Sequence, residues 1–208
     1  MCSLLTETRE ADEQSPARLV INPLAWWNWW LTLIAPAGIG AVYLFHSLGW
    51  HVLIAKPNAE ALALYLATFA CGVYAHSAIT TRDPLHMILG ALSVAFLCRE
   101  IHFTGSGPGI YVTLAVLAIW TVLWRNRLVV PLERGQTKAW LASTALLYVL
   151  SQAIARRAFA ARHLGLLPIE ETMHVPLEEF LENVGHLSLI VTSFAGRFRP
   201  IRRAARAE

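Results

Sequence analysis

Charged residues are scarce in this sequence, and cysteines are scarcer still. Lysine, arginine, aspartate and glutamate together make up 15% of the 208 residues, whereas about a quarter is usual in soluble proteins. The three cysteines are too few and too widely spaced to form a disulfide framework. Apolar residues account for 56% of the chain. This composition indicates a membrane protein.

Motifs for nucleotide binding and serine hydrolysis are also missing. The chain has no Walker loop, no Gly-x-Gly-x-x-Gly and no nucleophile elbow, so these activities have no support. A cleavable signal peptide is not expected, because the first 23 residues are polar and the apolar stretch after them is too long for one. We predict that this first apolar stretch stays in the membrane.

Six long apolar stretches dominate the rest of the chain. A helix needs about 20 mostly apolar residues to cross roughly 30 Å of hydrocarbon, and in an open chain only a helix satisfies its own backbone there. We therefore predict an all-α membrane bundle of six transmembrane helices within residues 24–197, between a polar segment (1–23) and a basic tail (198–208). The predicted spans run from Trp26 to Leu48, Ala59 to Thr80, Pro84 to His102, Pro108 to Trp124, Lys138 to Ala155, and Leu177 to Gly196.

Positive residues are concentrated at one end of the predicted spans. An even number of spans puts both termini on the same side, and most arginines and lysines fall on that side. The positive-inside rule then predicts cytoplasmic termini in the inner (plasma) membrane of a bacterium. Contact with anionic membrane lipid explains the basic tail, and no nucleic-acid partner is expected.

Ionisable residues inside the third and sixth spans are the candidates for function. Such residues are costly in hydrocarbon and therefore usually face the bundle interior. Glu178, Glu182 and His186 recur at every fourth position and share one helix face. Glu100 and His102 end the third span, on the side of the membrane where the sixth begins. We expect these five side chains to meet near the periplasmic face. The fifth span ends on the same side, and its last turns and the residue after it carry Tyr148, Ser151, Gln152 and Arg156.

Carboxylates and histidines together form ligand sets that suit zinc, manganese or iron. We predict that Glu100, His102, Glu178, Glu182 and His186 bind one such divalent metal. Glu182, His186 and Glu100 would then be the catalytic residues of a membrane enzyme that acts on a lipid-soluble substrate. The pattern lacks the Glu-x-x-His pairs of di-iron bundles and lacks His-Glu-x-x-His.

Two other interpretations remain open. Glu182 and His186 equally suit a proton relay in a proton- or ion-coupled transporter or channel component. The buried charges also suit pairing with a membrane protein partner, as in a non-catalytic subunit, an assembly factor or an immunity protein.

Simple structural roles compete with all three functions for some residues. Acidic residues are favoured in the first turn of a helix by the helix dipole. This preference alone would account for Glu179 and, less strongly, for Glu178. Arg99 and Arg156 could neutralise the carboxylates as static pairs. His76 and His86, at the inner turn, are weaker candidates for a ligand pair.

Overall fold

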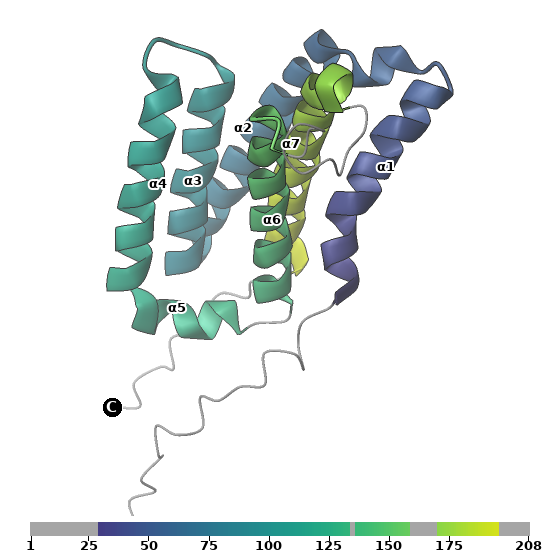
Figure 1. Cartoon of the computed structure of the whole chain (residues 1–208). Coiled ribbons are helices and arrows are strands. Elements are labelled where there is room, and N and C mark those ends of the chain that lie inside the picture. Colours follow the sequence, from purple (N-terminus) through teal and green to yellow (C-terminus); the bar gives the residue numbers. More distant parts are fainter. Residues whose placement is uncertain (1–28, 134–135, 159–169, 196–208) are drawn as a thin grey trace, which may run out of the picture.

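The computed structural model describes residues 29–133, 136–158 and 170–195, and these residues form helices joined by short turns, with no strand among them (Figure 1). The predicted all-α class is confirmed for this part of the chain. The predicted end segments, 1–23 and 198–208, lie outside the described residues. The helices are η2 (Trp29–Leu33), α1 (Ile34–Ser47), η3 (His51–Ile54), α2 (Lys56–Thr81), α3 (Pro84–Glu100), α4 (Ser106–Leu123), α5 (Arg125–Leu132), α6 (Thr137–Ala155) and α7 (Glu170–Ala195).

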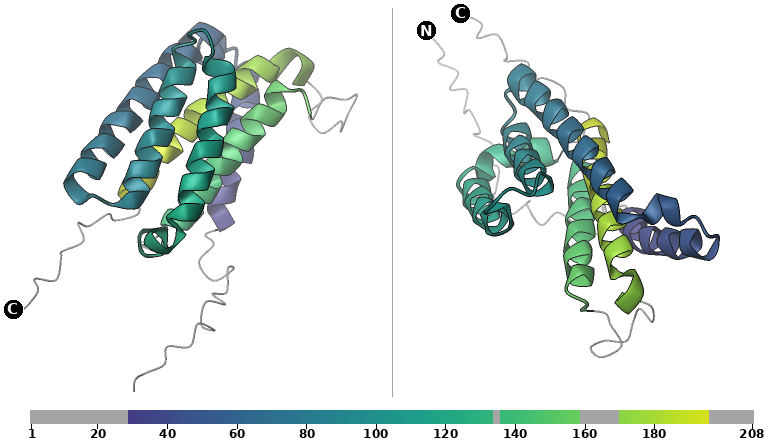
Figure 2. Two further views of the ribbon diagram at one scale, coloured as in Figure 1. Left: turned by 90° about the vertical axis from the view of Figure 1, so that its left-hand side faces the viewer. Right: turned by 90° about the horizontal axis from the view of Figure 1, so that it is seen from above.

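Six of the helices run alternately up and down, and the short α5 lies across one end of the bundle (Figure 1). Helix α7 is central, because it packs against α6, α2 and α1. Helix α4 packs against α3 and α5 only, at the edge of the described bundle (Figure 2). The C-terminal ends of α3 and α6 and the N-terminal half of α7 therefore lie at the same end, as the alternation of spans predicted.

The turn between α2 and α3 combines a left-handed residue with a side-chain cap. Helix α2 ends at Thr81, and Arg82 follows it with a φ of 53° in the left-handed region. The side chain of Asp83 then accepts a hydrogen bond of 2.9 Å from the backbone N–H of Leu85. Pro84 occupies the first turn, where its missing N–H costs nothing.

Two of the predicted element boundaries are wrong. The predicted loop between Arg125 and Lys138 contains α5, which is bent by 88° from α4 and buries Leu128 and Pro131. The last helix begins at Glu170 instead of Leu177 and continues through Pro176, so a single proline did not end it. Glu178 and Glu179 therefore lie in the third turn of α7, and the first-turn explanation for them is wrong.

Two of the described helical stretches are long and apolar enough to cross a membrane, Trp30–Ser47 and Lys56–Thr81. A third is obtained if the bent pair of α4 and α5 is counted as one broken span. Helix α3 has only 17 residues, while α6 and α7 carry many polar side chains. Six crossings and the side of the termini remain predictions.

The described helices bury polar side chains and expose apolar ones. Val149 and Phe194 of α6 and α7 are 66% and 65% exposed. By contrast, Glu182 and His186 are 3% and 1% exposed, and several hydroxyl groups on the same two helices are just as buried. Helices α6 and α7 thus combine buried polar side chains with apolar side chains on their outer surfaces.

Candidate functional site

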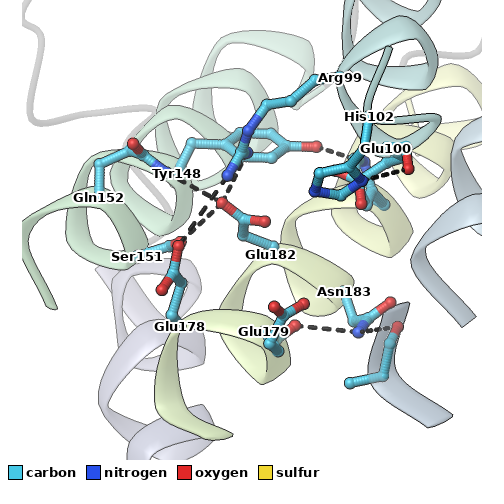
Figure 3. Close-up of polar contacts among 12 residues, drawn as sticks. Arg99, Glu100, His102, Tyr148, Ser151, Gln152, Glu178, Glu179, Glu182 and Asn183 are labelled. Atoms are coloured by element: carbon cyan, nitrogen blue, oxygen red, sulfur yellow. Dashed lines mark hydrogen bonds and ion pairs between the residues drawn. The ribbon is translucent and has the colours of Figure 1, made fainter. Parts of the chain in front are cut away.

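Polar side chains from three helices meet at one end of the bundle (Figure 3). Arg99 and Glu100 come from the last turn of α3, and Tyr148, Ser151 and Gln152 come from the second half of α6. Helix α7 contributes Glu178, Glu182 and His186. Most of the residues predicted to share a site therefore do so.

Glu182 is the most heavily bonded residue of the site. Its Oε1 atom accepts hydrogen bonds from Arg99 Nη1 at 2.7 Å, from Gln152 Nε2 at 2.9 Å and from Ser151 Oγ at 3.1 Å. The Glu182 side chain is 4% exposed and that of Arg99 is 26% exposed. Arginine keeps its proton in proteins, so Arg99 brings a permanent positive charge to this ion pair between α3 and α7.

The same guanidinium group approaches a second acid. Arg99 Nη2 lies 4.0 Å from Oε1 of Glu178, whose side chain is 22% exposed. One arginine thus faces two glutamates of α7. The static pairing considered for Arg99 is observed, whereas Arg156 instead donates to Tyr111 Oη on α4, at 3.1 Å.

His186 is placed between a tyrosine and a glutamate from two other helices. Its Nδ1 atom lies 2.8 Å from the hydroxyl of Tyr148, within hydrogen-bonding distance. Its Nε2 atom lies 3.7 Å from Oε1 of Glu100, and the two side chains are 2% and 5% exposed. This nitrogen has no hydrogen-bond partner among the described residues, because 3.7 Å is too long for a hydrogen bond. The relay chain, as we name Tyr148, His186 and Glu100, links all three helices.

Aromatic packing fixes the relay chain in place. The ring of Phe96 stacks on that of Tyr148 with centroids 4.3 Å apart and meets the His186 ring edge-on at 5.7 Å. On its other side Tyr148 lies against Gly185, where an added Cβ would be only 3.1 Å from Cζ of the tyrosine. Sequence reasoning missed Phe96 and Gly185. A glycine next to the polar stripe of α7 was the only signal for either residue.

Two residues of the neighbourhood are less closely involved. His102 follows the end of α3 with a φ of 53°, is exposed, and places its Nδ1 atom 2.6 Å from the backbone carbonyl of Glu100. The backbone carbonyl of Glu179 accepts a hydrogen bond from Asn183 at 2.9 Å.

The predicted metal ligands are not arranged to hold a metal. Within residues 29–133, 136–158 and 170–195, no three histidine, cysteine, aspartate or glutamate side chains could bind one ion together. The charge that neutralises Glu182 is the guanidinium of Arg99, and His102 points to a backbone carbonyl. The geometry of the described donors therefore gives no support to the predicted zinc, manganese or iron site.

Further buried hydroxyl groups continue from the relay chain along the interface of α6 and α7. Thr144 precedes Tyr148 by one helical turn of α6. Its hydroxyl oxygen lies 2.7 Å from Ser188 Oγ, within hydrogen-bonding distance. Thr192 donates to the backbone carbonyl of Ser188, and Ser193 follows at 8% exposure. We call Thr144, Ser188, Thr192 and Ser193 the hydroxyl track.

The hydroxyl track ends at a groove at the opposite end of the bundle. Ser193 lines this groove of about 840 Å³ together with residues of α2 and the start of α3. Both His76 and His86 line it as well. Buried polar residues of α7 thus occur at intervals from His186 to Ser193.

Comparison with known proteins gave no relative: no family matches the chain, and neither a characterised protein nor a solved structure does.

Proposed function

We propose that this protein is a multi-pass membrane protein that binds and transfers protons, as a proton-coupled transporter or channel component. The protein crosses the inner membrane six times with both termini in the cytoplasm. Its relay chain of Glu100, His186 and Tyr148 takes up protons near the periplasmic face. The predicted metal-dependent enzyme ranks behind this function, because no three donor side chains converge among the described residues.

The contact between Glu100 and His186 carries the proposal. A bare Nε2 atom facing a bare carboxylate would place two acceptors against each other in a buried environment. At least one proton must therefore be held by one of the two groups. A buried pair whose interaction depends on a proton is a proton-binding site, and its position within a bundle suits a relay.

Tyr148 gives the bound proton a second partner. When His186 is neutral with its proton on Nε2, the Tyr148 hydroxyl donates to Nδ1. When His186 takes up another proton, Nδ1 becomes a donor and the same hydroxyl accepts. The distance of 2.8 Å suits both directions. The hydrogen bond thus persists while its direction reverses.

The fixed charges around the relay chain favour an extra proton. Arg99 is the one arginine or lysine in the cluster, and it faces Glu178 and Glu182 while Glu100 lies against His186. Three carboxylates thus share a single permanent positive charge. A proton bound by the relay chain reduces the net negative charge of this group. Repulsion between like charges is stronger where little solvent enters, so the reduction matters more in a buried site.

The hydroxyl track supplies a route toward the cytoplasmic side. From His186 to Ser193 the helix rises roughly 10 Å, at about 1.5 Å per residue. Thr144 and Ser188 lie within this rise, and the groove that Ser193 lines opens beyond it. Where two groups are too far apart for a direct hydrogen bond, as Tyr148 and Thr144 are, a bridging water is required to pass the proton.

The surface of the helices supports the proposed six crossings. Apolar side chains cover the outer faces even of α6 and α7, as Val149 and Leu187 show with 66% and 50% exposure. Helix α5 lies across the end that bears Arg125 and Arg127, both exposed. A short helix with exposed arginines suits the surface of the cytoplasmic leaflet, where positive residues accumulate.

Proton flux through the purified protein in liposomes tests this function. With a pH-sensitive dye inside and potassium with valinomycin to clamp the voltage, the protein should dissipate an imposed pH gradient. Glu100→Gln and His186→Gln should each lower the flux by about tenfold or more, since each removes a proton-carrying group.

The matched control is Glu60→Gln. Glu60 lies on α2 and pairs only weakly with exposed Lys56 at 3.4 Å, so its loss should leave the flux unchanged. A wild-type flux no greater than that of protein-free liposomes would overturn the proposal. So would an undiminished flux in both relay variants.

A further inference from the structure

A second cavity lies on another side of α7, away from the relay chain. This groove of about 500 Å³ runs between η3 and α2 on one side and α7 on the other. Helix α7 lines it with Phe180, Asn183, Val184 and Leu187, which form one helix face. Its volume is within the range of ligand pockets in proteins.

Apolar side chains make up most of the groove, and several of them are open to the surroundings. Leu62 of α2 is 49% exposed and Leu187 of α7 is 50% exposed, while Val52 of η3 is 71% exposed. In the proposed topology these side chains face the hydrocarbon of the outer leaflet. A molecule therefore enters this groove from the membrane.

Asn183 is the buried polar group of the groove, and its orientation is fixed. Its Nδ2 atom donates to the backbone carbonyls of Ala59 at 3.0 Å and of Glu179 at 2.9 Å (Figure 3). Two carbonyl acceptors identify this atom as the nitrogen. The other atom, Oδ1, is buried and has no hydrogen-bond partner among the described residues, and Asn183 is 6% exposed.

A buried oxygen without a donor is costly, and in hydrocarbon no water replaces the missing partner. We propose that the groove binds a lipid-soluble molecule with an apolar body and a hydroxyl group, and that the hydroxyl donates to Oδ1 of Asn183. Leu62 and Leu187 line the groove beside Asn183 and are half exposed, so they can change rotamer without disturbing the core when the hydroxyl enters.

Photolabelling tests this site in lipid nanodiscs. The probe is a hexadecanol that carries a diazirine in its chain and a terminal alkyne, and the matched probe is its methyl ether. The ether fits the same apolar space but has no donor. We expect the alcohol to label peptides of α2 and α7 about fivefold more than the ether, as one hydrogen bond predicts.

Two variants separate the groove from the hydrogen bond. Leu62→Trp fills the groove and should abolish labelling by both probes, whereas Leu64→Trp, on α2 but outside the groove, should not. Asn183→Leu should remove the preference for the alcohol. If this variant fails to fold, the wild-type comparison of alcohol and ether still decides. Equal labelling by the two probes, or labelling that survives Leu62→Trp, would overturn the proposal.

Discussion

Arg99 donates to Glu182 across the interface of α3 and α7 at 2.7 Å, although 83 positions separate them in the chain. This pair divides the site into two parts. Glu182 accepts from three donors on one oxygen, while Glu100 and His186 lie against each other without a hydrogen bond. The sequence favoured Glu182 and His186 as the relay groups, and the geometry favours Glu100 and His186.

Removing the positive partner of this ion pair should destabilise the protein more than removing the negative one. Arg99→Met leaves Glu182 buried without a counter charge, which should cost about 3 kcal/mol in the free energy of unfolding. Glu182→Gln should cost less, because Arg99 is partly exposed and keeps Glu178 nearby. The double variant should recover most of the loss. Reversible unfolding in detergent measures all three, and equal losses would contradict this ranking.

Gly185→Ala should disturb the relay chain directly. The added Cβ would lie 3.1 Å from Cζ of Tyr148 and would displace the ring, which disturbs its contacts with His186 and Phe96. We expect a loss of about 1–3 kcal/mol in stability, as for other overpacked cores, together with a reduced proton flux.

Gly72→Ala is the matched control for that substitution. Gly72 also lies inside a helix, and an added Cβ there meets nothing within 4 Å. Stability should stay the same or rise by about 0.5–1 kcal/mol, because alanine favours helix. Similar thermal shifts and flux in the two variants would show that the packing of Tyr148 on Gly185 is unimportant.

The six-crossing topology predicts which residues react with a membrane-impermeant thiol reagent. In a variant without the native cysteines, Phe103→Cys, beyond α3, should react from the periplasmic side of intact cells. Asn126→Cys, on α5, should react only after the membrane is opened, because it lies at the proposed cytoplasmic end. Both native side chains are exposed, so access is governed by the membrane. Labelling of both positions in intact cells would contradict the topology.

Elemental analysis tests the predicted metal site. Protein purified without chelators should contain far less than one zinc, manganese or iron per chain, because the described donors do not converge. A stoichiometric metal that disappears in both Glu182→Ala and His186→Ala would restore the predicted metal site. Metal that persists in both variants would lie elsewhere.

The sequence predicted the convergence of the site but not its internal pairing. The alternation of spans placed Glu100 and His186 at the same end of the bundle, since helix direction follows from counting. Which glutamate takes Arg99 and which faces His186 depends on helix rotation and side-chain packing, which periodicity does not determine. The stacking of Phe96 on Tyr148 and the space left by Gly185 are packing features of this kind.

The helix boundaries failed for an equally physical reason. The last span was expected to begin at Leu177, directly after Pro176. The chain instead forms helix from Glu170, where Met173 and Leu177 are buried in one cluster with residues of α1 and α6. Burial of these side chains outweighs one missing backbone hydrogen bond. Tertiary packing of this sort is invisible in the local sequence.

The most direct test of the central claim is the protonation of His186, measured by nitrogen-15 NMR on histidine-labelled protein in nanodiscs. A His186→Asn variant assigns the signal. We predict that the Nε2 resonance of His186 changes position in Glu100→Gln, because the two side chains share a proton in the proposed relay, and that Glu60→Gln leaves it unchanged. A His186 resonance that is identical in the wild type and in Glu100→Gln would contradict the proposed relay.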